Sequence, residues 1–153
     1  MPTHHETKVL PYSARQMYDL VADVGTYPQF LPWNSAARVR IRRPAPTTAE
    51  PQAEVLEADL VISFKVFRER FASRVVLLPT AMRIETEYLD GPFRHMRSTW
   101  GFRDLEGGGC EVDFFVDFEF RNALLQSIIG LVFNDAMQRV VRAFERRAAV
   151  LYG

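Results

Sequence analysis

The sequence predicts an α+β fold in which one long C-terminal helix covers an antiparallel sheet. Three observations support this prediction: apolar and polar residues alternate from Ala37 onward, the alternation is sharpest over Val112–Phe120, and apolar residues recur every three or four positions after Asn122. A period of two is typical of strands with one face in water, and the longer period is typical of an amphipathic helix. We expect about six to seven strands, two short helices after the first strand, and a single domain over residues 1–153.

The N-terminal part of the chain begins with a short strand candidate, Thr7–Leu10. Ser13 then has the character of an N-cap for a helix over Ala14–Val21. The next apolar segment, Tyr27–Trp33, contains two prolines, which prevent a long regular helix. We therefore expect a short helical turn or loop there that carries much apolar surface.

The later strands are predicted in meander order, each with one apolar face. The proline-rich segment over residues 43–52 separates the first two of them and is too short to divide domains. The alternation assigns these side chains to the apolar face: Val39, Ile41, Leu56, Ala58, Leu60, Ile62, Phe64, Phe67, Phe71, Val75, Leu77, Met82, Ile84, Thr86, Tyr88, Met96, Trp100, Phe102, Val112, Phe114, Val116, Phe118 and Phe120.

Asn122 is expected to cap a helix that runs to about Leu151. At about 1.5 Å per residue this helix is roughly 43 Å long, enough to cross the whole sheet. A curved sheet against a straight helix leaves space between them, and this space is the candidate binding site. The apolar stripe of the helix consists of Leu125, Ile128, Ile129, Val132, Phe133, Ala136, Met137, Val140, Val141, Phe144 and Ala148.

The composition is that of a soluble globular protein, with 48% hydrophobic and 25% charged residues. The formal net charge is zero, so no overall field attracts nucleic acid, and we expect no DNA partner. The single cysteine, Cys110, excludes an internal disulfide and a cysteine-based zinc cluster. The sequence offers neither an apolar run of membrane-spanning length nor a signal peptide, which favours a cytoplasmic location, with an association peripheral to the inner membrane left open.

Catalysis is not expected, because the apolar face of the sheet carries almost no titratable side chain. Glu69 is the exception, and we expect it at a strand end near solvent rather than as a buried base. His95 falls on the outward face, and His4 and His5 are interpreted as a surface pair rather than as metal ligands. Known catalytic motifs such as Gly-x-Ser-x-Gly and His-Glu-x-x-His do not occur.

Two arginine stripes leave a choice of partner open. One lies on the strand after Ala37 and the other on the long helix. A solvated face with local ion pairs is the favoured interpretation, and an anionic partner such as lipid headgroups or ribosomal RNA is the alternative. The stripes consist of Arg38, Arg40, Arg42 and Arg43, and of Arg139, Arg142, Arg146 and Arg147.

The segment Tyr27-Pro28-Gln29-Phe30-Leu31-Pro32-Trp33, after the helix end Leu20-Val21-Ala22-Asp23-Val24, resembles the signature of a known family. It is similar to the coenzyme-Q-binding branch of the START-like superfamily of polyketide cyclase/dehydrase and lipid-transport proteins. The similarity extends over nearly the whole chain and includes Leu89-Asp90-Gly91-Pro92-Phe93 and Trp100-Gly101-Phe102. The resemblance implies a helix-grip fold with an internal cavity. One departure is Asn34, where the family commonly has cysteine after the tryptophan.

The resemblance implies two functions. One is non-catalytic binding of ubiquinone or a similar polyisoprenoid lipid in support of respiratory electron transport or of quinone synthesis and delivery. The other is that of a ribosome-association toxin, which binds the large ribosomal subunit and blocks subunit joining. Burial of apolar isoprene units favours the first, and zero net charge disfavours a strong RNA binder.

We therefore predict a lipid cavity with no covalent cofactor and no metal. Trp100 and Tyr88 are expected to donate hydrogen bonds to a quinone carbonyl. Its predicted wall consists of Leu60, Ile62, Phe64, Phe71, Val75, Tyr88, Trp100, Phe114, Val116 and Phe118, its mouth of Phe30, Leu31 and Trp33, and its helical side of Ile128, Ile129, Val132 and Phe133.

Overall fold

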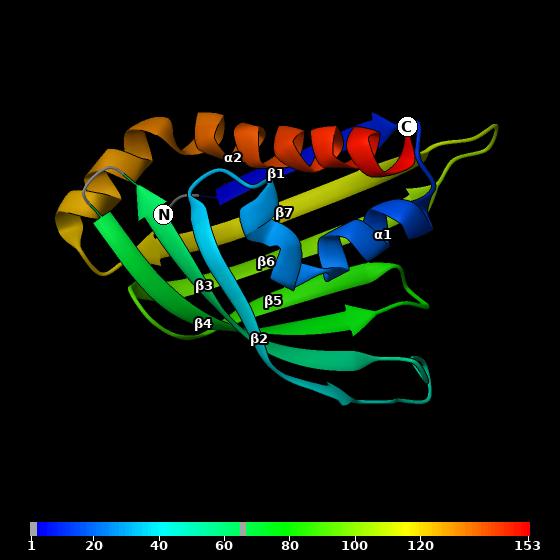
Figure 1. Cartoon of the computed structure of the whole chain (residues 1–153), viewed down its shortest axis with the longest axis horizontal. Coiled ribbons are helices and arrows are strands. Elements are labelled where there is room, and N and C mark those ends of the chain that lie inside the picture. Colours follow the sequence, from blue (N-terminus) through cyan, green and yellow to red (C-terminus); the bar gives the residue numbers. More distant parts are fainter. Residues whose placement is uncertain (1–2, 65–66) are drawn as a thin grey trace.

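Seven antiparallel strands form one sheet in residues 3–64 and 67–153, which are the residues that this computed structural model describes. The strand order is β1-β7-β6-β5-β4-β3-β2, so β1 and β2 lie at the two edges. In Figure 1 the helix α2 lies along one face of the sheet, and α1 lies near its C-terminal half. The elements are β1 (Thr3–Leu10), α1 (Ala14–Ala22), the 3-10 helix η1 (Val24–Gln29), β2 (Asn34–Pro44), β3 (Glu54–Phe64), β4 (Phe67–Leu78), β5 (Arg83–Asp90), β6 (Phe93–Asp104), β7 (Cys110–Phe120) and α2 (Ala123–Tyr152).

This architecture confirms the predicted α+β fold, and both predicted helix caps are present. The Ser13 hydroxyl accepts a hydrogen bond from the Gln16 amide at 3.1 Å, and the Gln16 side chain accepts one from the Ser13 amide at 2.9 Å. At the start of α2 the Asn122 side-chain oxygen accepts from the Leu125 amide at 2.9 Å. These bonds satisfy amides that have no partner inside their helix, so the two helices begin where the sequence indicates.

The sheet has one buried and one charged face. In β7 every second side chain from Cys110 to Phe120 is buried, as the alternation predicted. The outer face carries ion pairs between neighbouring strands, among them Arg74 with Glu87 at 2.7 Å and Arg103 with Glu111 at 3.1 Å. Basic and acidic side chains thus alternate from strand to strand, so this face largely neutralises itself.

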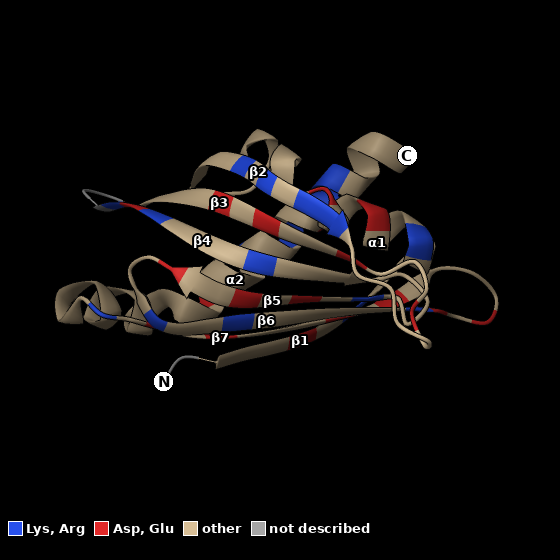
Figure 2. Cartoon of the chain, turned by 90° about the horizontal axis from the view of Figure 1, so that it is seen from below, with Lys and Arg blue, Asp and Glu red and all other residues tan. Residues whose placement is uncertain are grey.

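The edge strand β2 differs from its prediction. A bulge between Val39 and Ile41 inserts Arg40 as an extra residue, so the later side chains change face. Ile41 therefore lies opposite Glu57, with 40% of its surface exposed, and Arg42 lies opposite Leu56. Figure 2 shows the arginines of β2 along this edge of the sheet. The expected apolar face of this strand is wrong beyond Val39, because the bulge reverses the alternation.

The strand β1 begins earlier than expected, because it pairs with β7 along its whole length, from Thr3 opposite Asp117 to Leu10 opposite Cys110. This pairing places His4 under α2, where it is 8% exposed and its Nδ1 lies 3.3 Å from Oδ1 of Asn134. The interpretation of His4 as a surface residue is therefore wrong.

Candidate functional site

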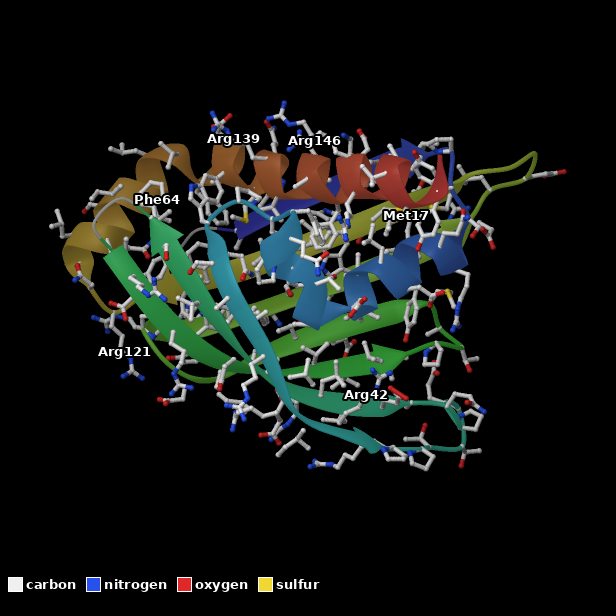
Figure 3. The ribbon with its side chains drawn as sticks, in the orientation of Figure 1. Met17, Arg42, Phe64, Arg121, Arg139 and Arg146 are labelled. Atoms are coloured by element: carbon white, nitrogen blue, oxygen red, sulfur yellow. The ribbon has the colours of Figure 1, made fainter. Side chains whose placement is uncertain are left out.

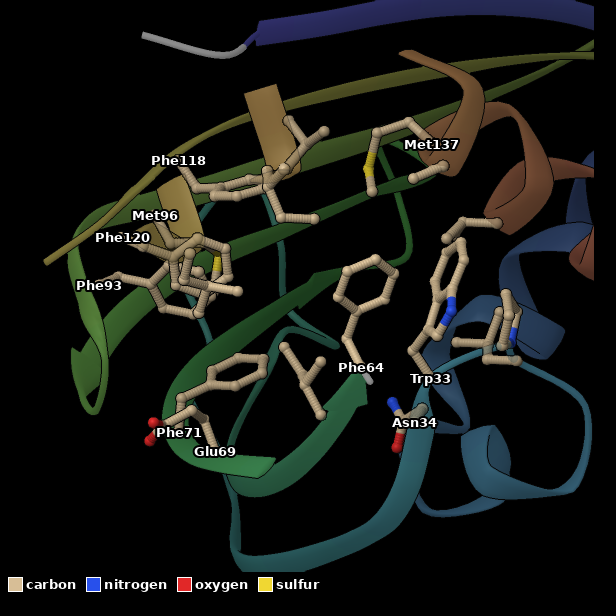
Figure 4. Close-up of a pocket in the computed structure, with 18 residues that line it drawn as sticks. Trp33, Asn34, Phe64, Glu69, Phe71, Phe93, Met96, Phe118, Phe120 and Met137 are labelled. Carbon is tan, nitrogen blue, oxygen red and sulfur yellow. The ribbon is translucent and has the colours of Figure 1, made fainter. Parts of the chain in front are cut away.

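A cavity of about 230 Å³ lies between the sheet and the N-terminal half of α2. Figure 4 shows its walls, with Phe93, Met96, Phe118 and Phe120 at one end and Trp33 and Met137 at the other. The lining comes from the segment after η1, from five strands and from α2. The 18 lining residues are Leu31, Pro32, Trp33, Asn34, Ile62, Phe64, Glu69, Phe71, Phe93, Met96, Val116, Phe118, Phe120, Leu125, Ile129, Ala136, Met137 and Val140.

The lining is almost entirely apolar. Among its described residues only Asn34 and Glu69 have hydrogen-bonding groups other than the Trp33 indole. Glu69 is exposed, as predicted, and lies in β4 near the end of the hairpin with β3. Such a surface gains free energy by taking apolar groups out of water, at about 25 cal/mol for each Å² buried. The arrangement is suited to binding an apolar molecule.

The segment from Tyr27 to Trp33 forms one rim of the cavity and is held at two points. The Tyr27 hydroxyl donates a hydrogen bond to the Val21 carbonyl, and burial raises the pKa of Tyr27 well above its usual range. The Phe30 ring packs edge-on against Phe144 at 5.2 Å. Leu31 follows and reaches the cavity. The rim is therefore anchored to α1 and to the C-terminal half of α2.

Trp33 adopts an uncommon backbone conformation at this rim. Its φ of 62° lies in the left-handed region, which costs a bulky residue about 1–3 kcal/mol. The Trp33 carbonyl accepts a hydrogen bond from the Ser63 amide at 2.7 Å, and its ring packs edge-on against Phe64 at 6.0 Å. These contacts hold the strained turn so that the indole faces the cavity (Figure 4).

Eight of the predicted site residues line this cavity. They come from the rim, from β3, β4 and β7, and from α2, so the structure brings together segments that are far apart in the sequence. Their role in binding a ligand remains a prediction. The eight are Leu31, Trp33, Ile62, Phe64, Phe71, Val116, Phe118 and Ile129.

Nine predicted residues lie outside the lining, and most of them fill the core elsewhere. Trp100 and Phe114 pack against each other at 4.3 Å, and Trp100 also packs against Phe144 at 5.0 Å. This cluster lies nearer to α1 and closes that part of the interior. Three further predicted residues belong to the core or pack against it and do not line the cavity: Phe30, Leu60 and Val75.

The remaining displaced residues have individual causes. The Tyr88 ring packs edge-on against Phe93 at 5.4 Å, and its oxygen accepts a hydrogen bond from the Phe93 amide at 3.2 Å. Phe133 packs against Phe118 at 5.0 Å, behind the cavity wall. Val132 is 41% exposed, and Ile128 is half-buried beside it on α2. Neither Tyr88 nor Trp100 lines this cavity, so their contact with a quinone carbonyl stays a prediction that the cavity geometry does not support.

The prediction missed ten lining residues. The alternation assigns Met96 and Phe120 to the apolar face, and they lie with Phe93 and Phe118 at one end of the cavity. Phe93 follows a turn, where alternation gives no signal. The ten are Pro32, Asn34, Glu69, Phe93, Met96, Phe120, Leu125, Ala136, Met137 and Val140.

Three of the four arginines in the predicted strand stripe, Arg40, Arg42 and Arg43, form the local ion pairs that the favoured interpretation expects. Arg40 and Arg70 both lie within 3.1 Å of Asp59, and Arg42 lies 2.6 Å from Glu54. On α2, Arg139 pairs with Asp135 at 3.1 Å. Figure 3 shows Arg139 and Arg146 pointing away from the sheet.

Arg142 and Arg146 are exposed on the same helix and have no carboxylate partner in the described part of the chain. No cluster of three or more metal-ligating side chains occurs among residues 3–64 and 67–153. Within the same residues no helix has the length and apolarity to cross a membrane.

The chain is similar to known proteins over nearly its whole length. Residues 10–145 match the family described as polyketide cyclase / dehydrase and lipid transport. A protein named ribosome association toxin RatA, from Rickettsia prowazekii (strain Madrid E), is 37% identical over 97% of this chain and 97% of its own. A Xenopus laevis protein named coenzyme Q-binding protein COQ10 homolog B, mitochondrial, is 32% identical over 98% of this chain and 59% of its own.

A solved structure has the same fold at similar identity. The solution structure of the 18 kDa protein CC1736 from Caulobacter crescentus matches with a TM-score of 0.78 and 35% identity, over 100% of this chain and 99% of that one. The predicted START-like resemblance is confirmed by the family match and by these relatives. The chain belongs to the polyketide cyclase/dehydrase and lipid transport family.

Proposed function

We propose that this protein binds a neutral apolar lipid, ubiquinone or a similar polyisoprenoid, in the cavity between α2 and the sheet. The observation that carries the proposal is the lining, in which aromatic, aliphatic and methionine side chains surround about 230 Å³. The similarity to a protein named for coenzyme Q binding supports the same ligand class. Binding would serve respiratory electron transport, or quinone synthesis and delivery.

The energetics favour an isoprenoid tail. Burying one five-carbon isoprene unit is worth about 4 kcal/mol at roughly 0.8 kcal/mol per carbon, so two or three units offset the costs of association. The cavity is smaller than the range of about 300–1,000 Å³ usual for ligand pockets. It would therefore hold only part of a long-tailed lipid, and the rest of the tail would lie outside it.

We propose no catalytic role for the cavity. General acid–base chemistry needs a titratable group positioned in a desolvated site. The described lining offers only the carboxylate of Glu69, which is exposed. Cyclase chemistry, which the family description includes, would require a second such group on the cavity wall.

A transient contact with a membrane surface fits this function, because an insoluble lipid must be collected from a bilayer. Leu124, Leu131 and Val132 support it, with exposed fractions of 64%, 87% and 41%. Leu124 and Leu131 project about 100–160° around the helix axis from Leu125 and Ile129, which line the cavity, and Val132 lies almost in line with Leu125. The protein would then act in the cytoplasm, at the periphery of the inner membrane.

The test is lipid extraction followed by titration. Protein from a quinone-producing host should carry quinone, and a quinone with a short tail should quench the emission of Trp33, which lines the cavity. In the Trp100→Phe variant Trp33 is the only tryptophan, so quenching should be strong. Trp33→Phe is the matched control, because Trp100 is packed outside the cavity and should be quenched less. Lipid-free protein that binds no added quinone would rule the proposal out.

The second candidate is a ribosome-association role. The 37% identical relative with that name favours it, as do the exposed arginines Arg142 and Arg146 on α2. This function predicts co-sedimentation with the large ribosomal subunit that weakens steeply as salt rises, because each phosphate contact releases counterions. Arg142→Gln with Arg146→Gln should reduce co-sedimentation while quinone binding stays unchanged. Salt-independent sedimentation, or none, would contradict this role.

A further inference from the structure

Asn34 lies in the cavity wall, and Figure 4 shows its side-chain nitrogen toward Phe64 and Trp33 and its oxygen on the opposite side of the amide. It is the first residue of β2 and lies opposite Ile62 on the inner face of the sheet. Its side-chain oxygen is buried and has no hydrogen-bond partner among the described residues. A buried carbonyl oxygen without a partner costs the protein its desolvation penalty, so its presence in an apolar wall calls for an explanation.

The surroundings of Asn34 offer no charge. Trp33, Phe64 and Ile62 are its neighbours in the lining, and Figure 4 shows the amide beneath the Trp33 and Phe64 side chains. Glu69 lies two strands away in the same row, because Ile62 pairs with both residues, and two strand spacings separate their backbones by about 10 Å. A molecule in the cavity therefore meets the neutral Asn34 amide beside the Trp33 indole at this end, and the Glu69 carboxylate lies further along the same row.

An amide can both accept and donate hydrogen bonds, and rotation about its last side-chain bond presents either atom. It can serve a quinone carbonyl, which accepts, and a quinol or alcohol hydroxyl, which donates. It cannot neutralise a carboxylate or phosphate, and the described lining contains no lysine or arginine.

We infer that Asn34 is the head-group contact of this cavity and selects neutral lipids with a hydrogen-bonding head over acidic lipids and over plain hydrocarbons. This inference rests on the proposed lipid binding and specifies its ligand class. The head lies at Asn34, and the tail runs toward Phe93, Phe118 and Phe120 at the other end of the cavity.

The test compares three probes with the same tail: decylbenzoquinone, decylbenzene and decanoate, each measured by displacement of an environment-sensitive lipophilic dye. The native protein should bind the quinone about fivefold to tenfold more tightly than decylbenzene, the effect of one hydrogen bond, and should bind decanoate most weakly. Asn34→Leu, which is similar in size, should remove the preference for the quinone and leave the affinity for decylbenzene equal or higher.

Ser35→Ala is the matched control, because Ser35 is the next residue of β2, is exposed, and shares its hydrogen bond with Ser63 outside the cavity. It should keep the quinone preference. The ligand-free Asn34→Leu variant should also melt about 2–4 °C higher, because an unpaired buried atom is removed. Asn34→Ala provides a second variant if the leucine does not fold.

The outcomes separate the two proposals. If no probe binds to the native protein, the proposed lipid binding is wrong. If the quinone and decylbenzene bind equally well to the native protein, or if Asn34→Leu weakens both by the same factor, lipid binding stands and the head-group role of Asn34 is wrong.

Discussion

The interior under α2 has two halves that differ in how they are filled. In the closed half, near α1, Met17 and Val21 point into the core and are at most 1% exposed. They pack in the same core as Trp100 and Phe144, whose rings lie 5.0 Å apart. In the hollow half, under the N-terminal part of α2, the cavity of about 230 Å³ remains open between apolar walls.

The difference indicates which half of the interior contributes more to stability and which half leaves space that a ligand could occupy. Both halves have the same kind of apolar sheet and the same helix above it. The closed half also receives the buried α1 side chains Met17, Leu20 and Val21, and Figure 1 shows α1 near the C-terminal half of α2. The hollow half has the short rim around Trp33 instead, which borders the space without filling it.

The largest expected effect comes from removing an aromatic ring in the closed half. Phe144 is 3% exposed and contacts Tyr27, Phe30 and Trp100, so Phe144→Ala should lower the free energy of unfolding by about 3–5 kcal/mol. The matched change in the hollow half is Met137→Ala, which enlarges an existing cavity and should cost about half as much. Urea unfolding of both variants measures the difference. Equal losses would contradict the division into two halves.

The sequence predicts the two layers of the fold but not this division. Alternation assigns Val116 and Phe118 to the inner face, and the apolar repeat places Ile129 opposite them, because these signals depend on backbone period alone. The alternation is the same at Trp100, which packs against Phe114 and Phe144 and does not line the cavity. Whether a space is filled depends on how far α1 reaches, and this distance is set by tertiary packing.

Two further features were beyond the sequence for related reasons. The bulge at Arg40 adds one residue without changing the local composition, so nothing in the pattern shows that Ile41 turns outward. Asn34 was noted as a departure from the related family, and only the structure places it in the cavity wall without a partner. The rim was predictable, because two prolines prevent a long helix there and the large apolar side chains of Leu31 and Trp33 need a buried surface to pack against.

A smaller effect should appear at high pH and should also come from the closed half. Burial raises the pKa of Tyr18 to about 12 from its usual value of 10.0, and its ring packs edge-on against Phe102 at 5.9 Å. Because the unfolded chain loses this proton first, the stabilisation is complete below pH 10 and is lost as the pH rises to about 12. We expect a loss of about 2 kcal/mol over this interval, since each pKa unit corresponds to about 1.4 kcal/mol and Tyr18 is buried.

The measurement for Tyr18 is urea unfolding at several pH values between 9 and 12 for the native protein and for Tyr18→Phe. The variant should lose less stability than the native protein over this range, since phenylalanine has no proton to release. Parallel curves for the two proteins would show that folding does not raise the pKa of the Tyr18 hydroxyl.

The smallest effect on stability should come from filling the hollow half. Ala136 is 6% exposed and lines the cavity, so Ala136→Leu places three more carbons in empty space and should change the free energy of unfolding by less than about 1 kcal/mol. The same change at Ala148, which is fully buried and lies outside the cavity lining, should cost about 1–3 kcal/mol through overpacking.

Ligand binding should respond in the opposite way. Ala136→Leu should weaken the binding of decylbenzoquinone at least tenfold, because the added side chain occupies the ligand's space. Ala148→Leu should leave the affinity of the folded protein unchanged. A loss of stability in Ala136→Leu as large as that in Ala148→Leu would mean that the hollow half has no spare volume, and the division between a stabilising half and a binding half would fail.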